Sequence, residues 1–360
     1  MAINLATKYA GSAAERFSQQ SITQGAFCDD FEFTGVATLK VYSVDTVPLG
    51  SYSRSGTARY GTPAELGDSV QELTMSQDKA FTFVIDKGND AEQMNVKGAA
   101  KCLRREIDEQ VTPAVDKYRL LKWAQNAGLG ACLAAAPTKS TIMGFILDAT
   151  AAMDNALVTP TGRKMFVKTS VYKVLKQADE FLSVEKIADR ALRRGVVGEI
   201  DGMEVVKVPD SWMPADVYFM IVQKSACISP VKLQDYKLHK DPPGISGSLA
   251  EGRILYDAFV IGARQKGIYV AAASGKRCTE PTISPNGGAY TAGTTTVTLT
   301  AGSGEVIKYT LDGSDPKTSS TAQTYSSAIA TTGWSGPVKL RCFASKSGLY
   351  DSGESSAVFA

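Results

Sequence analysis

The sequence predicts an α+β body followed by a small all-β sandwich. Near Ser274 a part rich in charged residues gives way to residues 281–360, which are dominated by Ser, Thr and Gly. Short β-prone runs at 294–300, 306–311 and 338–344, separated by Gly-rich turns, are typical of a sandwich. The body mixes apolar runs of period two with one long run of period three to four. Two units with separate roles are therefore expected, and the main function is sought in the body.

The N-terminal part of the body predicts an arm and a projecting hairpin. Apolar residues fall four apart from Leu5 to Phe17, which favours a short amphipathic helix on the arm. A β-type run at 31–44 is matched by an alternating run at 78–86. The polar stretch between them is longer than a loop inside a compact domain. We expect an extended hairpin that reaches a neighbouring subunit.

A long helix is predicted after the hairpin. Asp90 is a capping residue, Gln93 completes a capping box and Gly128 is suited to end the helix. An element of this length spans about 50 Å. Pro113 should bend it, because proline removes a backbone donor and crowds the preceding turn. The apolar stripe expected to form the core face of this helix includes Leu103, Ile107, Val111 and Tyr118.

The rest of the body predicts a mixed arrangement of helices and strands. Neither a glycine-rich nucleotide loop nor a Gly-x-Ser-x-Gly nucleophile turn occurs in it. The sequence therefore contains no motif typical of nucleotide binding or of α/β-hydrolase catalysis. The expected helices are 140–156, 170–178 and 184–194, and the expected strands are 164–168, 204–208, 217–223, 254–261 and 267–270.

Charge and residue usage exclude several kinds of site. The net charge is only +2, with both signs interspersed, so no basic stripe for sequence-specific DNA binding is expected. The six cysteines are scattered and predict reduced structural thiols. His239 is the one histidine, so we expect no histidine-based metal site, no catalytic relay and no cofactor. No secretory signal or membrane span is apparent, so a soluble protein made in the cytoplasm is expected.

Several segments of the body resemble a known family in the same order along the chain. Residues 46–54 and 77–89 are similar to its extended loop and return strand, and 103–119 to its spine helix. Residues 198–211 and 252–260 are similar to its axial domain and the return from it. The family is the major capsid protein of tailed bacteriophages, with the Hong Kong 97 type of fold, and the resemblance covers about residues 1–273.

This resemblance implies a division of the chain into named parts. Residues 281–290 and 307–316 are in turn similar to the immunoglobulin-like module found at the ends of some chitobiases. The implied parts are an N-terminal arm (1–33), an extended loop with flanking strands (34–88), the spine helix and peripheral domain (89–137), an axial domain (138–250), return strands of the peripheral domain (251–273), a flexible linker (274–280) and an immunoglobulin-like domain (281–360).

Within the C-terminal module, two groups of residues are candidate ligand contacts. Asp312 and Asp315 suggest calcium, but an Asp-Gly turn after a strand accounts for them. Tyr290 and Trp334 are candidate glycan contacts, with core aromatics of the sandwich as the favoured interpretation.

The resemblance implies a structural role with no enzymatic activity. Many copies, as hexamers and pentamers, would self-assemble into the icosahedral shell that encloses phage double-stranded DNA, so the protein is expected in the virion. A scaffolding protein and a portal are the implied assembly partners, DNA is contacted non-specifically, and no membrane is involved. The module is expected to face outward and to reach surface glycans. The implied assembly contacts are Tyr52, Arg54, Arg59 and Tyr60; no lysine occurs at 45–68, so no covalent crosslink between subunits is expected there.

Two other classes remain open. A carbohydrate-active enzyme needs two carboxylates across a cleft, and Asp148 and Asp154 lie six apart on a predicted helix, hence on different faces. A surface adhesin that binds glycans through 281–360 would need a secretion signal.

Overall fold

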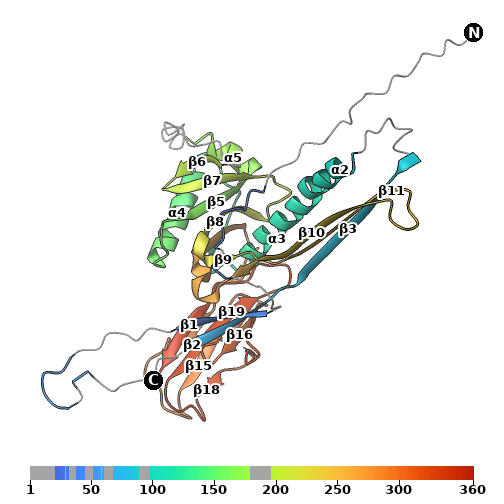
Figure 1. Cartoon of the computed structure of the whole chain (residues 1–360). Helices are drawn as coiled ribbons and strands as arrows, with labels where there is room; N and C mark the ends of the chain where they lie inside the picture. Colours follow the sequence, from blue (N-terminus) through green and yellow to red (C-terminus); the bar gives the residue numbers. More distant parts are fainter. Residues whose placement is uncertain are drawn as a thin grey trace, which may run out of the picture.

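The computed structural model has the predicted α+β architecture with a C-terminal all-β sandwich. It describes residues 21–28, 30–31, 38–44, 52–57, 59–60, 68–88, 98–178 and 196–360. Figure 1 shows a mixed α/β part at the top, a long ribbon of strands beside a helix, and the sandwich below. No helix in these ranges has the length and apolar character needed to cross a bilayer.

A six-stranded mixed sheet organises the body. Its order is β4-β13-β8-β5-β7-β6, with β8 antiparallel to both of its neighbours. Helices α4 (Ile142–Asn155) and α5 (Thr169–Leu175) pack on one face. The strands are β4 (Leu129–Leu133), β5 (Arg163–Lys168), β6 (Val196–Ile200), β7 (Met203–Val208), β8 (Val217–Gln223) and β13 (Ile268–Ala273).

The central strands are apolar on both faces because helices cover both. Met165 and Val167 of β5 point to the core under α4 and α5, whereas Phe166 points to the opposite core with Trp123. A strand buried on both faces has a continuous apolar run rather than an alternating one. This explains why these strands were predicted close to their observed bounds.

The long helix consists of α2 (Ala99–Glu106), a π-helical segment (Ile107–Val111) and α3 (Thr112–Gln125). Gly98 is extended, so the predicted start at Asp90 is wrong for this helix; Asp90 and Gln93 themselves lie outside the described residues. The π segment ends two residues before Pro113. A wider turn relieves the clash between the proline ring and the preceding turn, so the predicted disturbance takes this form.

The predicted core stripe of the helix is only partly buried. Leu103, Ile107, Val111 and Tyr118 are half-buried, and α2 has no buried residue. The fully buried apolar side chains belong to α3, because only this half lies on the sheet. They include Leu120, Trp123 and Ala124.

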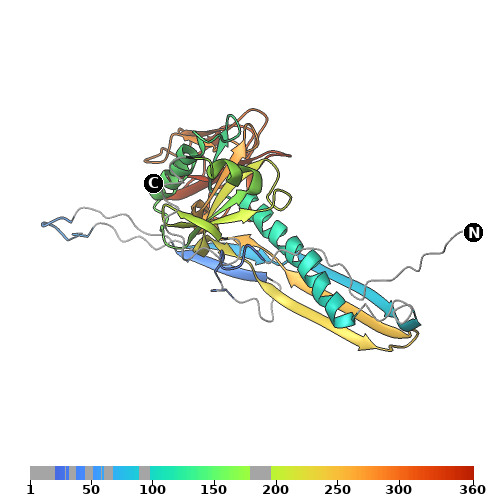
Figure 2. The ribbon, with the colours of Figure 1, turned by 90° about the horizontal axis from the view of Figure 1, so that it is seen from above.

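A three-stranded antiparallel ribbon extends from the body alongside the helix (Figure 2). It consists of β3 (Gln77–Asp86), β10 (Val231–Lys240) and β11 (Gly247–Tyr256), with β11 in the middle. Gly252 of β11 lies against the Phe81 ring, where a Cβ atom would approach to 2.3 Å. The glycine therefore allows Phe81 to cross the ribbon.

The projecting hairpin has a different return strand from the predicted one. β1 (Thr38–Val44) pairs with β2 (Asp68–Thr74), not with residues 78–86, which form β3 in the ribbon. The sequence of β2, DSVQELT, contains only two apolar residues. Its weak apolar pattern is the reason that sequence reasoning missed it.

Residues 281–360 form the predicted sandwich. Its first sheet contains β14 (Thr282–Ser284), β15 (Thr296–Thr300) and β18 (Ile329–Ala330). The second contains β16 (Val306–Thr310), β17 (Gln323–Thr324), β19 (Val338–Ser345) and β20 (Ser355–Phe359). A separate core between the sheets includes Val297, Leu340 and Phe359.

The predicted flexible linker is instead packed between the sandwich and the body. Arg277 donates hydrogen bonds to the carbonyls of Gly130 (3.0 Å) and Ala127 (2.9 Å). Lys276 forms an ion pair with Asp216 (3.2 Å). A guanidinium offers five donors, enough to hold two carbonyls of a neighbouring segment. The small residues around Gly275 suggested flexibility, but Arg277 fixes the connection.

We predict that Leu120→Ala lowers the free energy of unfolding by about 2–5 kcal/mol, because it leaves a cavity between α3 and the sheet. Leu121→Ala is the control, since Leu121 is 38% exposed and Leu120 is fully buried. The control should change stability by less than about 0.5 kcal/mol. Equal denaturant midpoints for the two variants would contradict this placement of α3.

Candidate assembly surfaces

The four predicted contact residues lie together in one exposed turn. Tyr52 and Tyr60 pack edge to face with ring centroids 5.0 Å apart. The turn is closed by Ser53 N donating to Arg59 O (2.9 Å), and Arg59 Nε donates to Gly56 O (3.1 Å). Figure 1 shows this turn well away from the body.

The side chains of this turn have the chemistry of an interface. Tyr60 is 92% exposed and Tyr52 is 53% exposed. Arg54 and Arg59 are also exposed. Tyrosine and arginine are enriched among the residues that dominate binding energy at protein interfaces. An exposed aromatic pair flanked by guanidinium groups is suited to contact another protein surface.

A buried carboxylate on α3 holds the end of the N-terminal arm. Asp116 is fully buried and accepts hydrogen bonds from Ser21 Oγ (2.9 Å), Ile22 N (2.8 Å) and Thr23 Oγ1 (2.6 Å). Backbone and hydroxyl donors of the arm thus converge on one side chain. Residues 21–23 are therefore held at a fixed point on α3.

Arg119, one turn along α3, completes this anchor. Its Nη1 is 3.6 Å from Asp116 Oδ1 and donates to Thr23 Oγ1 at 3.0 Å. Its Nε donates to Ser229 Oγ (2.5 Å), and its guanidinium lies 4.6 Å from the centre of the Phe27 ring. Each charge is therefore paired and hydrogen-bonded, as burial requires.

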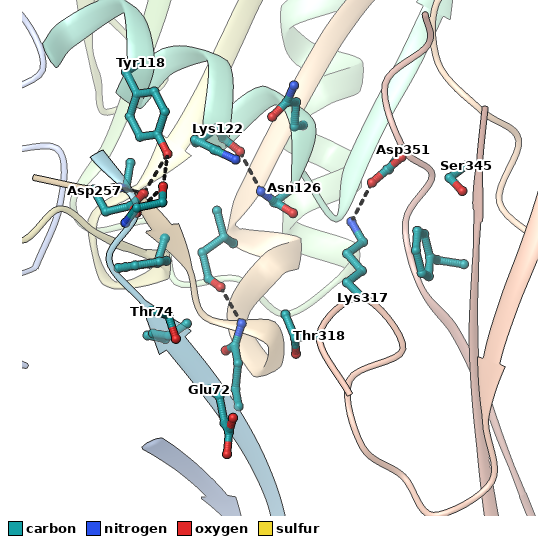
Figure 3. Close-up of a pocket in the computed structure, with 18 of the residues that line it drawn as sticks. Glu72, Thr74, Tyr118, Lys122, Asn126, Asp257, Lys317, Thr318, Ser345 and Asp351 are labelled. Atoms are coloured by element: carbon teal, nitrogen blue, oxygen red, sulfur yellow. Dashed lines mark hydrogen bonds and ion pairs between the residues drawn. The ribbon is translucent and has the colours of Figure 1, made fainter. Parts of the chain in front are cut away.

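A second buried carboxylate, Asp257, attaches the bend between β2 and β3 to the same helix. Its Oδ2 accepts from Ser76 N (2.7 Å) and Ser76 Oγ (2.9 Å), while its Oδ1 accepts from Tyr118 Oη (2.8 Å) and Ala258 N (2.8 Å). Burial, together with the bond to Asp257, raises the pKa of Tyr118 to about 12. Figure 3 shows this cluster.

The two clusters are joined, because Ser229 Oγ also donates to the carbonyl of Asp257 (3.2 Å). We call Asp116, Tyr118, Arg119, Ser229 and Asp257 the α3 network. Sequence reasoning missed it. The only available signal was that Asp116 and Arg119 are charged residues three apart on one helix, a spacing that surface ion pairs share.

A cleft of about 590 Å³ separates the body from the sandwich (Figure 3). Body residues Glu72, Lys122 and Asp257 line one side. Lys317 and Asp351 of the sandwich line the other. The cleft exists because the sandwich docks on the body, which the predicted flexible tether did not anticipate.

The two candidate glycan contacts belong to the core of the sandwich. Tyr290 and Trp334 pack edge to face at 5.4 Å, and Trp334 packs on Phe359 at 5.5 Å. Both are half-buried, and Tyr290 Oη donates to the carbonyl of Gly336 (2.9 Å). This arrangement matches the favoured interpretation, in which they are core aromatics.

The acidic turn after β16 also matches its structural interpretation. Asp312 Oδ1 accepts from Ser314 N (3.0 Å), and Asp315 Oδ1 accepts from Lys317 N (2.8 Å). Each carboxylate thus caps its own turn. Within the ranges described, no group of three His, Cys, Asp or Glu side chains is placed to hold a metal ion.

We predict that Asp116→Ala costs about 3–5 kcal/mol of stability, because it leaves Arg119 buried beside unpaired arm donors. Asp108→Ala removes a half-exposed partner of Arg104 at 3.9 Å and serves as the control. Its cost should be below about 0.5 kcal/mol. Chemical denaturation measures both. An Asp116 variant as stable as the control would show that the arm is not anchored there.

We predict that Arg277→Ala weakens docking of the sandwich by about 1.5–3 kcal/mol, because it removes two charged hydrogen bonds to the body. Hydrogen exchange at 127–130 and 274–280 should then be faster. Lys276→Ala, which removes only the half-exposed pair with Asp216, should leave exchange nearly unchanged. Slow exchange in the Arg277 variant would mean that other contacts hold the sandwich.

Comparison with known proteins supports both parts of this description. Residues 285–358 match the family model of the chitobiase/beta-hexosaminidase C-terminal domain. A search of curated proteins finds no match to the chain.

Solved phage structures share the fold of most of the chain. A Mycobacterium phage Che8 structure aligns with a TM-score of 0.61 at 15% identity, covering 75% of this chain and 98% of that one. The capsid structure of cyanophage P-SCSP1u gives 0.61 at 14%, covering 75% and 93%. The mature capsid of bacteriophage PhiM1 gives 0.57 at 12%, covering 76% and 93%. The phage capsid fold predicted from the sequence is thereby confirmed, with an immunoglobulin-like module at its C-terminal end.

Proposed function

We propose that this chain is a major capsid protein whose copies assemble into the closed shell of a phage head. The observation that carries the proposal is the match of three quarters of the chain to nearly the full length of capsid chains. The role is structural, and its mechanism is assembly.

The geometry of the chain supports this role. A shell subunit must hold a rigid body while offering extended segments to its neighbours. Here the six-stranded sheet with α3 supplies the body, and the exposed turn at 52–60 is an extended segment. The α3 network holds residues 21–23 of the arm and Ser76 of the hairpin against α3. These segments would therefore keep a defined position on the body when they contact a neighbouring subunit.

The finer partners follow from this role. Rings of five and six copies, a scaffolding protein and a portal would complete the shell. With a net charge of +2, the chain would contact packaged DNA weakly and without sequence preference. The sandwich would be carried at a fixed orientation on each subunit, since Arg277 holds it to the body.

The match of residues 285–358 favours one further role, weak glycan binding by the sandwich. Many copies on one particle would give useful avidity to weak contacts. Tyr290 and Trp334 are committed to the core, so such binding would use other residues. A glycosidase role gains no support, because Asp154 is paired with Arg163 at 2.6 Å.

We predict that the double variant Tyr52→Ala/Tyr60→Ala folds normally but fails to assemble, because it removes the aromatic pair of the projecting turn. Negative-stain microscopy and gradient sedimentation of the chain expressed with its scaffolding protein measure assembly. Leu157→Ala is the control, because Leu157 is also 92% exposed but lies at the end of α4. Normal shells from the double variant would contradict the role of the turn; absence of shells from the unaltered chain would contradict the proposed function.

A further inference from the structure

One lysine in the sandwich is buried with an amine that lacks a hydrogen bond. The side chain of Lys317 is only 10% exposed. Its Nζ is buried and has no hydrogen-bond partner in the part of the chain that the structure describes. Removing an ammonium ion from water without acceptors is costly, and burial accordingly lowers the pKa of Lys317. A lowered pKa brings the amine closer to its unprotonated, nucleophilic form.

A carboxyl group lies beside this amine. Asp351 Oδ2 is 4.0 Å from Lys317 Nζ, as the dashed line in Figure 3 shows. This distance is too long for a hydrogen bond. Burial raises the pKa of the Asp351 carboxyl group. An amine and a carboxyl group side by side are the two reactants of an amide bond, and orienting reactants in this way removes much of the entropic barrier.

A second acid completes the group. Glu354 Oε2 accepts from Arg341 Nε (3.1 Å) and Nη2 (2.5 Å), but the buried Oε1 has no partner among the described residues. Burial raises the pKa of Glu354, whose charge interacts with that of Lys317. The Phe343 ring, 5.2 Å from Lys317 Nζ, forms an apolar wall. A free carboxyl oxygen in such a site is suited to relay a proton.

We propose that Lys317 and Asp351 form an intramolecular isopeptide bond. Lys317 Nζ attacks Cγ of Asp351, so that the N–C bond forms and the C–O bond to the carboxyl hydroxyl breaks. The hydroxyl leaves as water with one of the two amine protons, and Glu354 Oε1 relays that proton. The balance is one amine and one carboxylic acid giving one amide and one water, with no oxidant or cofactor.

This bond would staple the segment after β16 to the segment before β20. Both segments line the cleft on the body side of the sandwich. It joins two residues of one chain, so it is distinct from any crosslink between subunits and independent of the proposed capsid function. Its expected effect is to keep the cleft side of the sandwich closed when the rest of the chain unfolds.

Peptide mass spectrometry of the full-length chain tests the proposal directly. Trypsin cleavage without the bond yields 309–317 and 347–360 as separate peptides. With the bond, cleavage after Lys317 is blocked, and 309–339 appears joined to 347–360 with the loss of one water. Tandem fragmentation should place the link between Lys317 and Asp351. The joined species is expected to dominate.

Three variants discriminate the chemistry. Lys317→Arg keeps a long basic side chain but cannot form the amide, so the water loss should disappear. Asp351→Ala should give the same result, and Glu354→Gln should yield mainly separate peptides when sampled at the same time after synthesis. Water loss that persists in Lys317→Arg would locate the dehydration within Asp351 and Ser352 and would overturn the proposal. Unmodified peptides from the wild-type chain would overturn it as well, and a full joined yield from Glu354→Gln would remove Glu354 from the mechanism.

Discussion

The buried ion pair between Asp116 and Arg119 on α3 is the interaction on which the arrangement of this chain depends. It ties two segments that are far apart in sequence to a single helix, and the neighbouring Asp257 holds a third. The arm binds Asp116, the turn after β9 (Cys227–Ile228) binds Arg119 through Ser229, and the bend between β2 and β3 is held nearby by Asp257. An apolar core can fill this space but cannot dictate which donors meet which acceptors. The polar contacts therefore fix where the arm and the hairpin leave the body.

The parts of the fold that were predicted from sequence are those with strong local periodicity. β5 and β8 are continuous apolar runs, and the sandwich strands alternate between apolar and polar residues, so their positions followed from the residues themselves. β2 was missed because its pairing with β1 supplies the stability that its own side chains do not. Likewise, the helix was predicted to begin at Asp90, whereas α2 begins at Ala99 because Gly98 is extended.

The candidate assembly surfaces also differ in how far they could be predicted from local sequence. Tyr52, Arg54, Arg59 and Tyr60 were named as contact residues because they cluster within nine residues of sequence, and their contacts with a neighbouring subunit stay a prediction. The α3 network and the docked sandwich were not predictable, since each depends on contacts across about one hundred residues or more, such as Ile22 with Asp116 and Ala127 with Arg277. Only the folded chain brings Lys317 and Asp351 side by side, with Glu354 three residues further along. The α3 network and the docked sandwich thus both depend on long-range polar contacts.

A cryo-electron microscopy reconstruction of particles formed by this chain tests the central claim most directly. The account predicts a closed shell in which α3 and the six-stranded sheet form the wall and the turn at 52–60 contacts an adjacent copy. It also predicts density for the sandwich in one fixed orientation on each subunit, with Arg277 at its base. Particles that lack a closed shell, or a shell in which the turn touches no neighbour, would contradict the account.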